Sequence, residues 1–156
     1  MHSRFPSLLV LFVCCYVSSS GSAPLRVPSS SMISWNAGAS WIFHASDGKN
    51  QRLGEFAVLL TDEPGAACLV GAWKRARLEE SSFTVLDLKG LYANGTQYPV
   101  YMTSGEQLTL LLNPGTCDDY LILQGRLSGT LIKGEIRAVT VGSFQRIGGF
   151  VAKPGG

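Results

Sequence analysis

The 156-residue chain is rich in apolar residues and poor in charge, with 46% hydrophobic and 15% charged residues. Soluble domains carry about a quarter of charged residues, and disordered chains lack apolar ones, so this composition excludes disorder. The formal net charge is only +2. Lys74, Arg75 and Arg77 lie close together, but two glutamates follow them at once. This excludes the sustained basic face that nucleic-acid binding requires.

The first segment, residues 1–23, has the three-part pattern of a secretory signal peptide. Arg4 precedes an apolar run over residues 8–17, and small residues then lead to Ala23 and Pro24. The run is about half as long as the roughly twenty apolar residues that cross a bilayer. The pattern therefore predicts a secreted, extracellular protein without a membrane span.

Cys14 and Cys15 lie inside this leader and leave a second interpretation open. A bacterial lipoprotein leader also places a cysteine after a short apolar run, and that cysteine is lipidated. Such leaders carry a small residue just before the cysteine, whereas Val13 precedes Cys14. Free secretion is therefore favoured, and a periplasmic or lipid-anchored protein is the alternative.

Two cysteines remain outside the leader, Cys68 and Cys117. In an oxidising compartment an even pair predicts a disulfide. The bond would close a loop of about fifty residues and stabilise the fold by roughly 4 kcal/mol in the chain-entropy model. The alternative is a reactive or metal-binding thiol.

The rest of the chain divides into a flexible N-terminal arm over residues 24–31 and a single all-β domain over residues 32–153. The arm contains two prolines and a serine run, while the domain alternates short apolar stretches with turn-forming residues. We expect about eight to ten short strands. They are residues 40–45, 56–60, 67–73, 83–88, 98–102, 107–112, 120–127, 130–139 and 147–152, with a further short one at 32–35. The best helix candidate, residues 73–80, is only about two turns long, and its surroundings favour extended structure.

Turn signals at intervals of about eight to twelve residues are typical of an antiparallel sandwich or barrel. Several strands are apolar at both phases, for example at Leu59 and Ile122, which indicates two-sided burial or a lined cavity. Glycines inside strands, such as Gly125 and Gly134, allow a sheet to bend and close. The prediction is therefore a small antiparallel β-barrel, with a β-sandwich as the alternative.

The triplet Gly71-Ala72-Trp73 resembles the Gly-x-Trp element that opens the first strand of lipocalins and avidins. The resemblance implies a closed barrel, but the triplet lies well inside the chain and assigns no family. The immunoglobulin pattern is not matched, because Trp73 follows Cys68 too closely and Gly115 stands where a tyrosine is expected.

Motifs for catalysis and for metal binding are missing from the domain. Its one histidine, His44, alternates with Trp41 and Phe43, so its side chain should point to the opposite face. Once the cysteines are paired, no second soft ligand for zinc remains. We therefore expect a non-enzymatic protein with neither a cofactor nor a metal. Catalysis ranks behind the two binding hypotheses given below. Asn94 opens an Asn-Gly-Thr sequence that fits both an N-glycosylation site and a hairpin turn.

The excess of apolar residues predicts a binding protein whose interior or cleft takes a small apolar ligand. The residues expected to line this site are Trp41, Phe43, Trp73, Phe83, Phe144 and Phe150. The alternative is a secreted protein-interaction module of the inhibitor or adhesion type, acting through loops at residues 46–52, 62–66 and 113–119.

Overall fold

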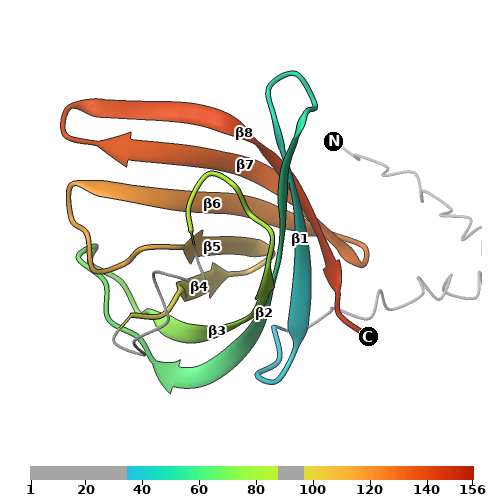
Figure 1. Ribbon diagram of the computed structural model, residues 1–156. Coiled ribbons are helices and arrows are strands. Elements are labelled where there is room, and N and C mark those ends of the chain that lie inside the picture. Colours follow the sequence, from blue (N-terminus) through green and yellow to red (C-terminus); the bar gives the residue numbers. More distant parts are fainter. Residues whose placement is uncertain (1–34, 88–96) are drawn as a thin grey trace, which may run out of the picture. The chain divides into compact units, whose positions relative to one another are not determined.

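A computed structural model describes residues 35–87 and 97–156, and these residues form a closed antiparallel β-barrel (Figure 1). Eight strands follow one another around the barrel in chain order. They are β1 (Ser40–Asp47), β2 (Arg52–Pro64), β3 (Lys74–Ser81), β4 (Val100–Ser104), β5 (Gln107–Leu111), β6 (Asp119–Ser128), β7 (Leu131–Thr140) and β8 (Ser143–Pro154). The predicted barrel is confirmed, and the sandwich alternative is not adopted. Nowhere in these two ranges is there a helix that could cross a membrane.

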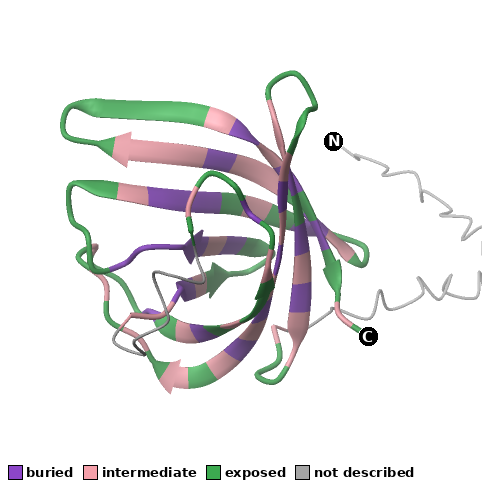
Figure 2. Cartoon of the chain, in the orientation of Figure 1, coloured by how far each residue is buried: buried purple, intermediate pink, exposed green. Residues whose placement is uncertain are grey.

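The core of the barrel comes from the strict alternation of side chains along its strands. Figure 2 shows buried positions recurring between more exposed ones on β1 and β2. The inward residues include Trp41, Phe43 and Ala45 on β1, Phe56, Val58 and Leu60 on β2, Leu108 and Leu110 on β5, Leu121 and Leu123 on β6, and Ile132 and Ile136 on β7. The period of two read from the sequence therefore defines the inner wall.

The barrel closes where β1 pairs with β8, from Trp41 opposite Pro154 to Asp47 opposite Gly148. The contact between β3 and β4 is the shortest, because only Lys74 and Arg75 pair with β4. β7 and β8, by contrast, pair over nearly their whole length and form a long hairpin (Figure 1).

Two glycines allow close approach inside the wall, Gly125 to the interior ring of Phe150 and Gly134 to the backbone of the paired strand β6. A Cβ atom on Gly125 would lie 2.7 Å from Cζ of Phe150, and one on Gly134 would lie 2.1 Å from the Gln124 carbonyl oxygen. Both distances are shorter than any real contact, so only glycine fits at these positions. A glycine inside a strand often marks a place where another group approaches the backbone closely, and Gly125 and Gly134 are such places.

The two ends of the barrel are built differently. At one, which we call the tryptophan end, the short hairpins 104–107 and 128–131 join the strands. Nε1 of Trp35 donates to the Gly105 carbonyl there at 2.8 Å, and its ring packs on Trp41 with centroids 6.0 Å apart. The other, the disulfide end, carries the connections 47–52, 82–87, 112–118 and 140–143, and loop 65–73 is attached to it by a disulfide.

Two of the expected strands, residues 67–73 and the described part of 83–88, are not strands, and the same physical reason applies to both. Residues 67–73 and 83–87 are bends and loops, because their apolar side chains pack on the barrel instead of joining its ladder. The weak helix candidate, residues 73–80, is extended, as its surroundings favoured, and forms strand β3. The predicted leader, the N-terminal arm, most of the optional strand at 32–35, residue 88 and Asn94 lie outside the described residues.

Candidate functional site

The barrel interior is filled by stacked aromatic rings. Phe43 stacks on Phe56 at a centroid distance of 4.8 Å and an interplanar angle of 3°. Phe150 approaches Phe43 at 5.4 Å, and Phe83 meets Phe56 edge-on at 5.5 Å. All four side chains are at most 6% exposed. Offset and edge-on pairs of this kind stabilise a core beyond the apolar area they bury, so the interior is a packed core.

The six residues predicted to line a ligand site fall into two groups. Trp41, Phe43, Phe83 and Phe150 belong to the interior cluster. Trp73 lies in a second cluster outside the barrel wall, and Phe144 is 59% exposed on the outer face. The structure therefore brings four of the six together, and their role in ligand binding stays a prediction.

One polar atom in the interior is left without a partner. The indole Nε1 of Trp41 is buried and meets no hydrogen-bond acceptor. An unpaired buried donor costs about 1–3 kcal/mol. No sequence signal separates this tryptophan from a fully apolar core residue.

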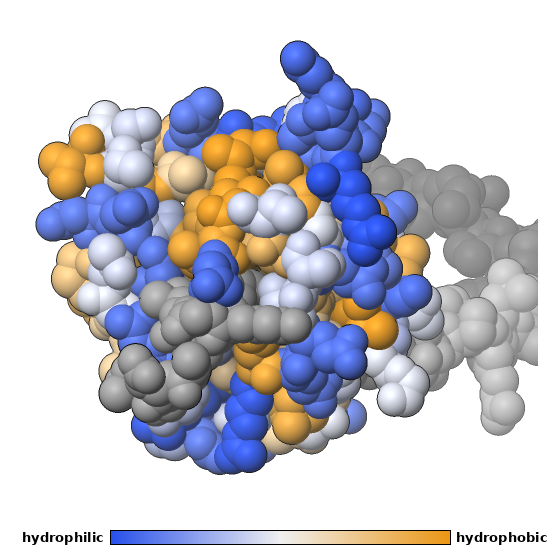
Figure 3. All heavy atoms as spheres, viewed as in Figure 1, coloured by the Kyte–Doolittle hydropathy of each residue, from blue (hydrophilic) through white to orange (hydrophobic). Residues whose placement is uncertain are grey.

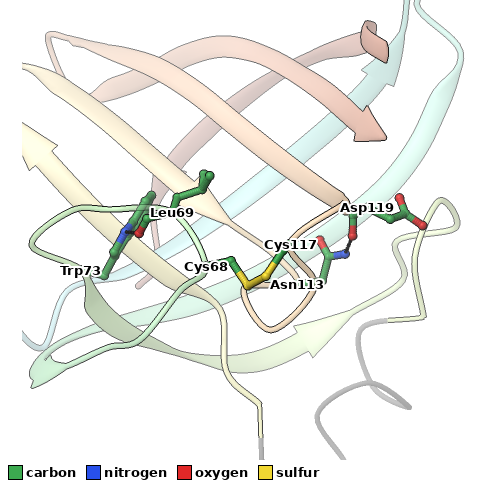
Figure 4. Close-up of a disulfide and its surroundings, with 6 residues drawn as sticks. All are labelled: Cys68, Leu69, Trp73, Asn113, Cys117 and Asp119. Carbon is green, nitrogen blue, oxygen red and sulfur yellow. Dashed lines mark hydrogen bonds between the residues drawn. A yellow bond between two sulfur atoms is a disulfide. The ribbon is translucent and has the colours of Figure 1, made fainter. Parts of the chain in front are cut away.

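The predicted disulfide between Cys68 and Cys117 is present, with the two Cα atoms 5.2 Å apart (Figure 4). It joins loop 65–73 to loop 112–118, and a hydrogen bond from the Cys68 amide to the Pro114 carbonyl supports the same contact. Within loop 65–73, Nε1 of Trp73 donates to the Leu69 carbonyl at 2.7 Å. The bond is consistent with an oxidising compartment.

The buried side chain of Asn113 fixes the second of these loops. Its Nδ2 donates to the Asp119 carbonyl at 2.6 Å, and its Oδ1 accepts from the Leu121 amide at 2.7 Å. One amide thus bridges the loop and the start of β6 (Figure 4). A buried asparagine that satisfies both its donor and its acceptor holds a loop in a single conformation.

Loop 65–73 covers an apolar cluster on the outer face of the barrel. Trp73 packs there against Val100, Leu111 and Ile122, and partly buried side chains extend the cluster. The extending residues are Ala67, Leu69, Met102, Tyr120 and Val139. Some strands are apolar on both faces because one face lines the barrel core and the other is covered by this loop. Of the two explanations offered by the sequence, two-sided burial and a lined cavity, this is the first.

Large apolar side chains remain exposed around this end. Val70 is fully exposed, Val141 is 81% exposed, and Phe144 and Val85 are 59% and 40% exposed. Figure 3 shows hydrophobic surface over the 82–87 segment and at the tip of the β7–β8 hairpin. We call Val70, Val85, Val141 and Phe144 the apolar rim. Val151, on the outer face of β8, is the other large apolar residue with comparable exposure.

The loops predicted to bind a partner coincide only in part with the segments that carry the apolar rim. Loop 113–119 is bonded through Cys117 to the loop that carries Val70, and hairpin 46–52 lies at the disulfide end. The expected loop at 62–66 is mostly strand, because β2 continues to Pro64. Loop 65–73 was missed, since its apolar residues imitate a strand. Gly65 and Gly71 at its two ends were the signal for a loop.

Charged groups beside the rim form pairs with an excess of positive charge. Nη2 of Arg137 donates to Glu135 at 3.0 Å, and Nε of Arg146 lies 3.5 Å from the same carboxylate. The hydrogen bond from Arg137 lowers the pKa of the Glu135 carboxyl. The guanidinium carbon of Arg137 also lies 4.9 Å from the centre of the Phe144 ring. An arginine stacked on an exposed aromatic ring therefore borders the rim.

His44 points outward, as its alternation with Trp41 and Phe43 predicted. Its Nδ1 lies 2.8 Å from Glu55 Oε2, and Nη2 of Arg52 lies 3.5 Å from the same oxygen. The Glu55 carboxylate thus contacts both His44 and Arg52 on the surface. Among the residues placed by the structure, no three acidic, histidine or cysteine side chains gather as a metal site would require.

Comparison with family models, with curated protein sequences and with solved structures found no significant match to this chain.

Proposed function

We propose that this chain is a secreted protein-interaction module that binds a partner protein through the apolar rim at its disulfide end. The observation that carries the proposal is that four large apolar side chains, Val70, Val85, Val141 and Phe144, stay exposed on the connections of a barrel whose interior is filled. Exposed apolar groups that gather in one place mark interaction sites more often than scattered ones do.

The rigidity of the rim supports this function. The Cys68–Cys117 bond ties the loop that carries Val70 to loop 112–118, which the Asn113 amide holds in place. A surface that is already ordered loses little conformational entropy when a partner binds. Val70 is thereby presented on a fixed loop, although no neighbour in the chain covers it.

The chemistry of the rim indicates the kind of partner surface that fits it. Arg137 stacked on Phe144 supplies the aromatic and arginine groups that dominate binding energy at many interfaces. Glu135 faces both Arg137 and Arg146, so the edge of the rim carries net positive charge. The matching surface is an apolar pocket bordered by acidic side chains.

Site-specific photocrosslinking tests the proposal. A photoreactive amino acid at position 70 or 141 should form a defined adduct with one protein in an extract of the source organism. The same group at Thr130, in the hairpin of the tryptophan end, is the positional control. Phe144→Ser should abolish the adduct, whereas Val151→Ser removes an exposed valine elsewhere and should leave it intact. Equal adducts at positions 70 and 130, or none at 70, would refute the proposal.

A small apolar ligand inside the barrel is the second candidate, and the unpaired Nε1 of Trp41 is the observation that favours it. A ligand with a carbonyl or ether oxygen would satisfy this donor. The stacked rings leave it no space in the present packing, so Phe83 and segment 82–87 would have to move outward on binding.

A further inference from the structure

A hollow of about 240 Å³ lies between β3, the start of β4 and the two loops joined by the disulfide. Its walls are Ala66, Arg75, Gln97, Tyr98, Val100, Pro114 and Gly115. It is separate from the apolar rim and from the barrel interior, and it combines an apolar floor with a cation and an amide. Ligand sites in proteins have this composition, in which a few polar groups converge on an apolar wall.

The cation in this hollow is incompletely neutralised. Arg75 Nη1 lies 3.6 Å from Glu63 Oε2, which is too long for a hydrogen bond, whereas Arg77 makes a close contact with the other oxygen of the same carboxylate. One carboxylate therefore faces two guanidinium groups, and Arg77 holds it more tightly. Arg75 instead lies over the Tyr98 ring, with its guanidinium carbon 4.8 Å from the ring centre.

The amide in this hollow lacks a partner for its acceptor. Oε1 of Gln97 is buried and accepts no hydrogen bond. The amide lies against Gly115, where a Cβ atom would be only 3.1 Å from Nε2, so the loop and the side chain are closely fitted. A buried carbonyl oxygen of this kind requires an O–H or N–H donor.

We propose that this hollow binds a small carboxylic acid that also carries a hydroxyl or amide donor. Arg75 pairs with the carboxylate through its free N–H groups, since a guanidinium forms its strongest hydrogen bonds with carboxylates. A rotation of the Gln97 amide turns the buried Oε1 toward the hollow, where it accepts the proton of the donor. Val100 and Pro114 contact the apolar body of the ligand. A cavity of about 150 Å³ takes up benzene in another protein, so about 240 Å³ accommodates one ring with two small substituents. This site goes beyond the proposed partner binding and does not depend on it.

Calorimetric titration of the full chain with 4-hydroxybenzoate tests the proposal. Benzoate, which has only the carboxylate, and phenol, which has only the hydroxyl, are the comparison ligands. The acid should bind saturably at one site and more tightly than either half. Arg75→Gln should weaken binding at least tenfold. The matched control is Lys74→Gln, which removes a positive charge from the neighbouring residue but neither lines the hollow nor pairs with Glu63, and it should change the affinity less than twofold.

Gln97→Leu gives an independent measurement on the same site. It removes the unpaired acceptor at nearly constant volume, so it should reduce the affinity for 4-hydroxybenzoate to that for benzoate and leave benzoate binding unchanged. Absence of saturable binding to the wild-type chain would overturn the proposal. Equal losses in Arg75→Gln and Lys74→Gln would overturn it as well, because they would indicate attraction to surface charge alone. Neither result would affect crosslinking at position 70.

Discussion

The two ends of the barrel share one core but differ in what they leave exposed. The tryptophan end has short hairpins, is closed by Trp35 on Trp41, and has no strongly exposed large apolar residue in its described part. The disulfide end has longer connections and carries Val85, Val141 and Phe144, and the disulfide attaches to it the loop that bears Val70. The comparison indicates that apolar exposure here is local, because one continuous core cluster fills the barrel interior.

Removal of the disulfide should have the largest effect and should separate the two ends. We expect the double variant Cys68→Ser, Cys117→Ser to lose about 4 kcal/mol of unfolding free energy in urea, because its unfolded chain is no longer cross-linked. In hydrogen exchange, loops 65–73 and 112–118 should lose protection while hairpins 104–107 and 128–131 retain it. A uniform loss at both ends would contradict the local role of the bond.

Asn113→Ala should have the next largest effect, a loss of about 2 kcal/mol, since it leaves the Leu121 amide and the Asp119 carbonyl unpaired. Thermal or urea unfolding measures the change. Gln124→Ala, at an exposed position on the neighbouring strand, is the control and should stay within about 0.5 kcal/mol of wild type. If both variants behaved alike, the Asn113 bridge would not restrain the disulfide end.

Trp35→Phe sharpens the comparison from the tryptophan end. It keeps an aromatic ring on Trp41 but removes the hydrogen bond to Gly105, and we expect a loss of about 1 kcal/mol. Crosslinking at position 70 should be unchanged in this variant. A lost adduct would mean that the two ends are coupled.

Tyr101 tests the core that both ends share and should give the smallest effect. Burial raises the pKa of its phenol, which donates to the Thr61 carbonyl at 2.8 Å. Because the folded state holds this proton more tightly than the unfolded chain, its contribution to stability is complete below pH about 10 and is lost as the pH rises further.

The unfolding free energy of the wild type should therefore fall above pH 10 more steeply than that of Tyr101→Phe. Lys74 acts in the same direction in both proteins, because the hydrogen bond to Asp62 raises its pKa and this stabilisation also disappears when the amine loses its proton. Parallel curves for the two proteins would show that the phenol does not contribute.

The sequence predicts the barrel well wherever a strand alternates strictly. Residues 107–112 and 120–127 match β5 and β6 to within one residue, because inward leucines recur at every second position. Alternation cannot distinguish a strand from an apolar loop packed on the outside, and residues 67–73 were therefore misassigned.

The candidate site was harder to predict than the fold, because it depends on contacts between distant segments. Trp73 and Phe144 were expected inside as aromatics, but Trp73 packs in the outer cluster beside the disulfide and Phe144 is exposed near the turn of the β7–β8 hairpin. The pairing of Cys68 with Cys117 could be predicted because these are the two cysteines outside the predicted leader. The unpaired acceptor of Gln97 has no sequence signal, since it results from the packing of Gly115 against it.

Native mass spectrometry of the protein, gently extracted from its source, tests most directly whether its contacts are made outside a filled barrel. We predict that no apolar ligand remains bound in a stoichiometric amount, and that lipophilic probes do not quench the fluorescence of the interior Trp41. An apolar molecule retained at one per chain and released only on unfolding would contradict this account.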